Sequence, residues 1–263
     1  MMILTNRITD TMVHSLLFAM FACAGQVEPS DTSTTADTAL TQPVDSHAAN
    51  TGSTADTGLK EVPPPPVDVL FVVDTSCSML NARPLVADEA PLILPFLKDR
   101  DWHIAAVTTE PQGTGTDLIR GDGSVSIIDA QLANPSSILT SIINVDASVN
   151  INYAIETILF LLERENSSVM EPLGFRRADA ELHIVFIADS DDASRDGVIT
   201  PNEFKAYLDA LDTAIFVHTL VPAKTAVRFI DLNQTFGGAT SDIAAYDRFD
   251  TFFLEMGMTL DLD

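Results

Sequence analysis

Residues 67–263 carry two hydrophobic patterns that alternate along the chain. The first is a continuous apolar run, such as Val69–Val73, which is typical of a strand buried on both faces. Three more runs of this kind occupy residues 102–107, 182–188 and 214–221. Between the second and third of these four runs, the apolar residues at 118–119 and 125–128 flank a Gly- and Asp-containing stretch. We expect that segment to form a hairpin at the edge of a sheet.

The second pattern places apolar residues at helical spacing. From Ile151 to Leu162 they fall three and four positions apart, which predicts an amphipathic helix. Residues 204–211 and 249–256 repeat this spacing. Residues 82–98 are also expected to contain helix, broken or bent at Pro91 and Pro95.

Strands and helices that alternate in this way predict an α/β fold. We expect a Rossmann-like, doubly wound, mostly parallel sheet with helices on both faces, built from one domain at residues 67–263. In such sheets, ligands bind outside the carboxyl ends of the strands. The residues that directly follow the strands are therefore the first candidates for a functional site.

The charge balance narrows the range of functions. The chain has 263 residues, with 14 Lys and Arg against 38 Asp and Glu, and a formal net charge of −24. Binding to nucleic acid or electrostatic docking on an anionic membrane requires a basic surface, so this balance argues against both. It is compatible with divalent cations. The two cysteines, Cys23 and Cys77, are too few for a disulfide framework or a cysteine-based zinc site.

The N-terminal residues have the pattern of an export signal. A short apolar core at residues 16–22 ends at Cys23, and this arrangement resembles the bacterial lipoprotein signal, in which the cysteine is lipidated and becomes the first mature residue. The resemblance implies an exported protein anchored by lipid alone, in the outer membrane, on its periplasmic side or at the cell surface. The alternative is an ordinary secretory signal, residues 1–23, with an incidental cysteine.

Residues 24–66 differ in composition from the rest of the chain. They are rich in Thr, Asp, Ser, Ala and Pro and contain no aromatic residue. Such a segment cannot bury enough apolar surface to offset its ordering entropy, so we expect a disordered tether that precedes the folded domain.

The strongest chemical signal follows the first strand. Residues 74–78 place Asp74, Ser76 and Ser78 in an Asp-x-Ser-x-Ser motif, which sets one carboxylate and two hydroxyls around a tight loop. These hard oxygen ligands suit magnesium. The alternative is a turn whose polar side chains cap the next helix. Cys77, between the serines, has no histidine nearby in sequence and is expected to be buried and unreactive.

This motif and its surroundings resemble the von Willebrand factor type A family. The run at residues 69–79 is similar to the opening of such a domain, residues 182–189 resemble the central strand that ends in a second site aspartate, and residues 236–243 resemble the turn and last strand. The resemblance covers residues 67–258. It implies a metal-ion-dependent adhesion site that holds Mg²⁺ or Mn²⁺ through Asp74, Ser76, Ser78 and Asp189.

The third loop of the site departs from the family pattern. The family places a Thr or Ser just before the helix that begins near Ile151, but the alignment puts Val149 at that position and Ser148 one residue away. A shift of one residue makes Ser148 a ligand. Without that shift the site loses a ligand and binds metal weakly or through water.

A second chemical signal follows the central strand. Residues 192–203 match a twelve-residue calcium loop, with its sharp-turn glycine at the sixth position. The expected Ca²⁺ ligands are Asp192, Ser194, Asp196, the carbonyl of Val198, and Glu203. The alternative is a helix cap, because residues 200–203 read Thr-Pro-Asn-Glu, a capping box with Pro at the first helical position.

Three functions remain open. The first is a tethered adhesion or binding module, not an enzyme, whose metal binds an Asp or Glu carboxylate of a protein partner. The second is a hydrolase of aspartic-protease type that uses Asp74, which requires an all-β fold. The third is a degenerate type A domain with a purely structural role.

Overall fold

Five parallel strands form one sheet in the order β2-β1-β3-β4-β5. The computed structural model describes residues 63–110, 117–121, 123–145, 152–246 and 249–261. All of them belong to one unit that runs from Gly58 to Asp263. The strands are β1 (Val67–Val73), β2 (Trp102–Thr108), β3 (Glu181–Ile187), β4 (Ile215–Val221) and β5 (Thr240–Asp242).

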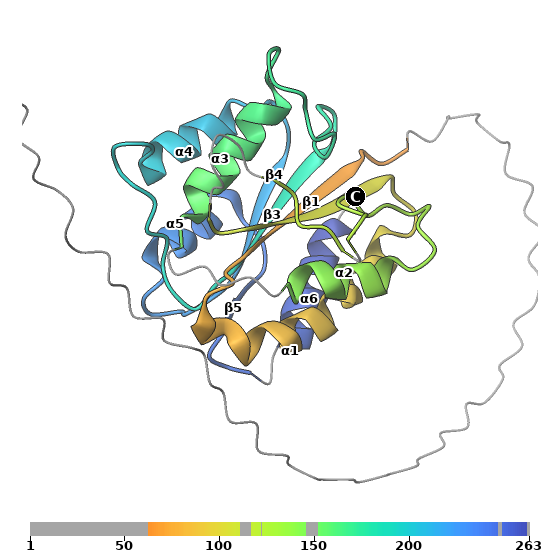
Figure 1. Cartoon of the computed structure of the whole chain (residues 1–263), viewed down its shortest axis with the longest axis horizontal. Coiled ribbons are helices and arrows are strands. Elements are labelled where there is room, and N and C mark those ends of the chain that lie inside the picture. Colours follow the sequence, from red (N-terminus) through yellow and green to blue (C-terminus); the bar gives the residue numbers. More distant parts are fainter. Residues whose placement is uncertain (1–62, 111–116, 122, 146–151, 247–248, 262–263) are drawn as a thin grey trace, which may run out of the picture. The chain divides into compact units, whose positions relative to one another are not determined.

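Helices cover both faces of the sheet (Figure 1). One face carries α1 (Ala82–Glu89), the 3-10 helix η2 (Ala90–Leu97), α2 (Pro135–Ile143) and α6 (Phe249–Leu260). The other carries α3 (Ala154–Glu165), α4 (Pro201–Asp209) and α5 (Val227–Phe236). The predicted doubly wound α/β fold is therefore confirmed.

Strand β1 shows why its sequence is apolar at nearly every position. Val69, Phe71 and Val73 point into the core beneath α1, α2 and α6, whereas Leu70 and Val72 point into the core beneath α3, α4 and α5. Side chains alternate between the faces of a strand, so a strand covered on both sides must be apolar at both sets of positions.

Two local expectations need correction. Helices α2 and α5 lie where the apolar spacing gave no helix. The expected edge hairpin is reduced to isolated antiparallel bridges, Ile104 with Ile128 and Gly121 with Val125. The expected interrupted helix at residues 82–98 is confirmed: α1 passes into the 3-10 helix η2, which contains Pro91 and Pro95, because proline cannot donate the backbone hydrogen bond of a continuing α-helix.

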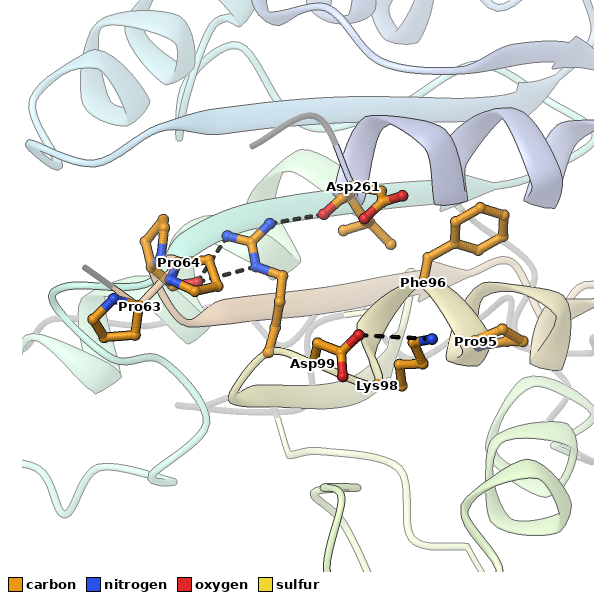
Figure 2. Close-up of a pocket in the computed structure, with 10 residues that line it drawn as sticks. Pro63, Pro64, Pro95, Phe96, Lys98, Asp99 and Asp261 are labelled. Atoms are coloured by element: carbon orange, nitrogen blue, oxygen red, sulfur yellow. Dashed lines mark hydrogen bonds and ion pairs between the residues drawn. The ribbon is translucent and has the colours of Figure 1, made fainter. Parts of the chain in front are cut away.

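The chain enters the sheet at the edge where the parallel strands begin. Arg100 fixes this entry: its Nη2 donates to the carbonyl oxygen of Pro65 at 2.7 Å and its Nη1 to that of Leu260 at 2.7 Å, and Nη2 also lies 2.8 Å from Oε2 of Glu181. A cavity of about 1060 Å³ opens here, and Figure 2 shows Pro63, Pro64 and Phe96 around it.

Within the described residues, no helix is both long and apolar enough to cross a membrane.

Candidate metal centre

Asp74 and Asp189 leave the sheet from adjacent strands at the same edge. In the register of the sheet, Val73 pairs with Thr108 of β2 and Ile187 of β3, and the amide of Asp74 donates to the Ile187 carbonyl at 2.8 Å. The chain passes from β1 to β2 on one side and then returns to β3 on the other. The carboxyl ends of β1 and β3 therefore form a topological switch point, where open α/β sheets bind ligands.

The loop after β1 holds the Asp-x-Ser-x-Ser side chains together. Oδ1 of Asp74 accepts the backbone amide of Ser76 at 2.8 Å, and the Ser76 and Ser78 hydroxyls lie 2.9 Å apart. Asp74 is buried, with 2 % of its surface exposed, whereas Ser76 is half-buried and Ser78 exposed. The carboxylate thus lies at the base of the loop and the hydroxyls at its mouth. Cys77 is exposed, so the expectation that it is buried is wrong.

The charges at this edge favour a cation. Burial raises the pKa of the Asp74 carboxyl and the neighbouring charge of Asp189 raises it further, while the hydrogen bonds from Ser76 and the charge of Arg83 lower the pKa by less. A buried carboxylate beside a second acidic group is costly to ionise. A divalent cation between them would remove that cost.

Three buried oxygens at the same edge have no hydrogen-bond partner among the described residues. They are Oγ1 of Thr75, Oγ1 of Thr109 and Oδ1 of Asn152. Thr75 lies in the loop after β1, Thr109 follows β2, and Asn152 is hydrogen-bonded to the residue after Asp189. Buried polar atoms in native proteins are rarely left unpaired. This donor set of carboxylate, hydroxyl and amide oxygens fits a hard divalent ion such as Mg²⁺ or Mn²⁺.

The described residues hold no group of three or more His, Cys, Asp or Glu side chains close enough to bind a metal ion. A metal at this edge must therefore use hydroxyl or amide oxygens in addition to Asp74 and Asp189. Ser148, the expected ligand from the third loop, lies outside the described residues. Asn152 was missed because the alignment considered only a hydroxyl in this loop.

The acidic residues after β3 are engaged with the start of α3. Oδ1 of Asp192 accepts the amide of Ile155 at 3.1 Å, and Oγ of Ser194 accepts the amide of Glu156 at 3.0 Å. Asp192 and Ser194 are both buried. These bonds satisfy two of the amides that the first turn of a helix leaves without an intrahelical partner.

A guanidinium group also binds this loop. Arg228, at the start of α5, donates through Nη1 to Oδ2 of Asp192 at 3.2 Å and to the Ser194 carbonyl at 2.9 Å, and through Nη2 to Oδ1 of Asp196 at 3.0 Å. Three of the five expected calcium-loop residues therefore contact one arginine. Calcium at residues 192–203 stays a prediction, and the ion would compete with Arg228 for the carboxylate oxygens of Asp192 and Asp196.

The helix-cap alternative for the end of this loop is confirmed. Oγ1 of Thr200 accepts the amide of Glu203 at 3.3 Å, and Oε2 of Glu203 accepts the amide of Thr200 at 2.8 Å, which completes a capping box at the start of α4. Glu203 therefore has a structural partner without any ion. Val198, the expected carbonyl ligand, is 40 % exposed.

An ion pair that the sequence did not reveal locks the loop to α3. The buried carboxylate of Glu156 accepts Nε and Nη2 of Arg195 at 3.1 and 2.7 Å. Burial alone would raise the pKa of Glu156, but the bonds and charge of Arg195 outweigh it and the pKa lies below its usual value. The segment that follows Asp189 is thus held to α3 by the bonds between Arg195 and Glu156, and to α5 by Arg228.

The known proteins that match this chain were found by comparing structures, not sequences. No protein-family model matches the sequence, and no curated protein does. A von Willebrand factor type A structure from Catenulispora acidiphila matches with a TM-score of 0.52 and 12 % identity, over 74 % of this chain and 43 % of that chain. This chain therefore spans less than half of that protein.

Two further structures match with TM-scores below 0.5. Proximal thread matrix protein 1 from the mussel byssus, solved with a zinc-occupied MIDAS motif, has a TM-score of 0.47 and 12 % identity, over 74 % of this chain and 47 % of that chain. The pilus adhesin SpaC from Lactobacillus rhamnosus GG has a TM-score of 0.49 and 12 % identity, over 77 % of this chain and 31 % of that chain. At these identities, the comparisons show the fold: this chain has the fold of a von Willebrand factor type A domain.

The fold decides against one of the three functions considered above. The aspartic-protease alternative required an all-β fold, whereas the described residues form a parallel sheet covered by helices on both faces. The hydrolase that would use Asp74 is therefore not supported, and the adhesion-type and structural alternatives remain.

Proposed function

We propose that this protein is a tethered binding module that uses a divalent ion, Mg²⁺ or Mn²⁺, to bind a carboxylate of a protein partner. Asp74, Ser76, Ser78 and Asp189 would hold the ion. The observation that carries the proposal is the position of Asp74 beside Asp189 at the switch point of the sheet, among buried oxygens that have no partner. The bound ion would supply a positive centre for an anionic oxygen of the partner.

The arrangement favours binding over chemistry. Two carboxylates balance the charge of one divalent ion, and the exposed side of the loop offers only neutral hydroxyls, which leaves coordination positions for water. A partner Asp or Glu can take such a position.

The location of the module is a proposal as well. A lipid on Cys23 would anchor the chain at a membrane, and residues 24–66 would form the tether between the anchor and the domain. The composition of the leader and of the tether supports this arrangement. Intact-mass analysis of membrane-extracted protein tests it, since a diacylated or triacylated Cys23 should be the first residue; membrane attachment that survives Cys23→Ala would contradict it.

Mn²⁺ binding to the purified full chain tests the metal centre directly. Electron paramagnetic resonance should show one tight site in the wild type and none in Asp74→Ala. Asp99→Ala is the matched control, because it removes the same charge from an exposed position at the opposite edge of the sheet. Equal binding by all three proteins would overturn the metal centre and leave the structural alternative.

The open coordination position has its own test. Water proton relaxation by protein-bound Mn²⁺ should fall when glutarate is added, because a carboxylate oxygen displaces a coordinated water. Glutaramide, which has the same shape without the charges, should leave the relaxation unchanged. A wild-type site that binds Mn²⁺ but does not respond to glutarate would contradict recognition of a carboxylate.

A further inference from the structure

Asn152 joins the ends of two strands that are not neighbours. Its side-chain Nδ2 donates to the carbonyl of Ser190, directly after Asp189, at 3.2 Å, and its own carbonyl accepts the amide of Ala193. The next residue, Tyr153, donates its amide to the carbonyl of Thr109 after β2 at 2.7 Å. The chain at 152–153 therefore spans from the end of β2 to the end of β3.

Strand β1 lies between β2 and β3, so this span crosses the end of β1, where Asp74 begins its loop. Side chains alternate between the two faces of a strand, and this alternation indicates on which face of the sheet the 152–153 segment crosses β1. Val72 and Val107 pack into the core beneath α3, and the residues two positions further on, Asp74 and Thr109, continue the same face. Asn152 precedes α3 and so lies on the side to which Asp74 and Thr109 are directed.

The amide oxygen of Asn152 is buried and has no partner among the described residues. Asn152 is 5 % exposed, and its Oδ1 accepts no hydrogen bond from them. The orientation of the amide is fixed, because exchanging its oxygen and nitrogen would set two acceptor oxygens, Oδ1 and the Ser190 carbonyl, against each other. A buried acceptor left unpaired destabilises the fold, because its lost hydration is not replaced.

The common structural role of an asparagine before a helix does not account for this oxygen. An Asn near a helix start usually caps the free amides of the first turn. In α3, the Ile155 and Glu156 amides are instead taken by Asp192 and Ser194, and Tyr153 occupies the cap position. The Asn152 oxygen therefore has no capping function.

We propose that Oδ1 of Asn152 is the third-loop ligand of the metal centre, in the role for which the sequence suggested Ser148. The inference rests on the proposed function, since it assigns a ligand to the same ion. An amide oxygen is a hard, neutral donor, so the centre keeps two carboxylates against two positive charges. Asn152 would add a buried oxygen to the half-buried Ser76 and exposed Ser78 hydroxyls.

The test compares Mn²⁺ affinity of full-length variants by paramagnetic resonance. Asn152→Ala should weaken binding at least about tenfold, the scale on which single groups at a metal site act. Asn152→Asp should bind at least as tightly as the wild type, because it keeps an oxygen at this position and adds a charge. Ser148→Ala should bind like the wild type.

A purely structural role predicts a different pattern. Asn152→Asp loses the Nδ2 donor to Ser190, so if that hydrogen bond alone mattered, Asp and Ala would weaken Mn²⁺ binding equally, and the proposal would be overturned. Thermal unfolding in EDTA, measured on the same proteins, separates lost folding from lost affinity. A variant that unfolds earlier in EDTA but binds Mn²⁺ like the wild type also counts against a ligand role.

The outcomes also distinguish this inference from the proposed function. If the wild type binds Mn²⁺, Asp74→Ala does not, and Asn152→Ala binds normally, the metal centre stands and the role of Asn152 is wrong. If Ser148→Ala is the variant that weakens binding, the third-loop ligand is Ser148. If the wild type binds no metal, both proposals fail together.

Discussion

Arg228 is bound to the buried carboxylate of Asp192, with Nη1 3.2 Å from Oδ2. Burial raises the pKa of Asp192, and its hydrogen bonds with Ser194, Ile155 and Arg228 only partly offset that effect. The arginine therefore compensates a charge that the fold has placed away from water. It also ties the loop after β3 to the start of α5.

Replacing Arg228 should destabilise the whole domain. Arg228→Met keeps much of the side-chain volume but leaves Asp192 without a cation, and we expect a loss of about 2–3 kcal/mol in the free energy of unfolding by urea. Asp196→Ala, which removes only the exposed partner of the same arginine, should cost far less. Equal losses in the two variants would show that the buried pair is not what holds the loop.

Calcium should distinguish the two interpretations of residues 192–203. If the loop binds Ca²⁺, saturating calcium raises the melting temperature of the wild type, and Glu203→Gln and Asp196→Ala reduce the shift. If the loop is only a cap, calcium has no effect and Glu203→Gln is as stable as the wild type, because Gln can also close a capping box. Thr200→Ala serves as the control for the cap and should cost about 1 kcal/mol in either case.

The ionisation of Asp74 should make the metal-free protein less stable as the pH rises. Its pKa is raised in the fold, so its contribution to stability is fully present below the ordinary value of 3.8 and is lost as the pH rises through the raised value. We therefore expect Asp74→Asn to be more stable than the wild type in EDTA at pH 7.5, with a smaller difference at pH 4. In excess Mn²⁺ at pH 7.5 the order should reverse.

The reversed order of stability in Mn²⁺ tests the metal centre more directly than the difference in EDTA does. A wild type that is more stable than Asp74→Asn even in EDTA would mean that Arg83 and the Ser76 amide compensate the carboxylate without any metal.

Two buried histidines should make the fold sensitive to acid. The amide of Ala239 donates to Nδ1 of His218 at 3.0 Å, so the proton of neutral His218 lies on Nε2 and is donated to Nδ1 of His183 at 3.0 Å. Burial lowers the pKa of both rings, and this effect is the stronger for His218, which also feels the charge of His183. Glu181, 3.8 Å from Nε2 of His183, opposes the shift there.

Groups with a lowered pKa bind protons mainly in the unfolded chain, so stability that is present above pH 6.5 is lost as the pH falls through the lowered values. The slope of unfolding free energy against pH between 6.5 and 5 should decrease in His218→Asn, which retains an acceptor for the Ala239 amide. If His218→Asn keeps the wild-type slope, the buried pair does not titrate on unfolding.

The sequence predicted those features that depend on a single strand or on the loop directly after it. β1 and β3 were predicted because a strand covered on both faces must be apolar throughout. Asp74 was singled out by its Asp-x-Ser-x-Ser motif, and Asp189 by the resemblance to the type A family. Helix α5 was missed because the polar Asn233 shares its buried face with Phe229 and Leu232, while the apolar Val227 is exposed, so the apolar residues do not follow a clear helical spacing. Asn152 and Arg228 could not be predicted, since their roles depend on contacts with residues 36–38 positions away.

The position of β1 determines how the module would respond to mechanical load. Pro65, held by Arg100, lies at one end of this strand and Asp74 at the other, so tension between an anchor and a captured partner would run along the strand axis. All seven residues of β1 are paired with both β2 and β3. Tension parallel to these ladders shears their hydrogen bonds together instead of opening them one after another. The strand that connects the two attachment points is thus the one that the sheet resists releasing most strongly.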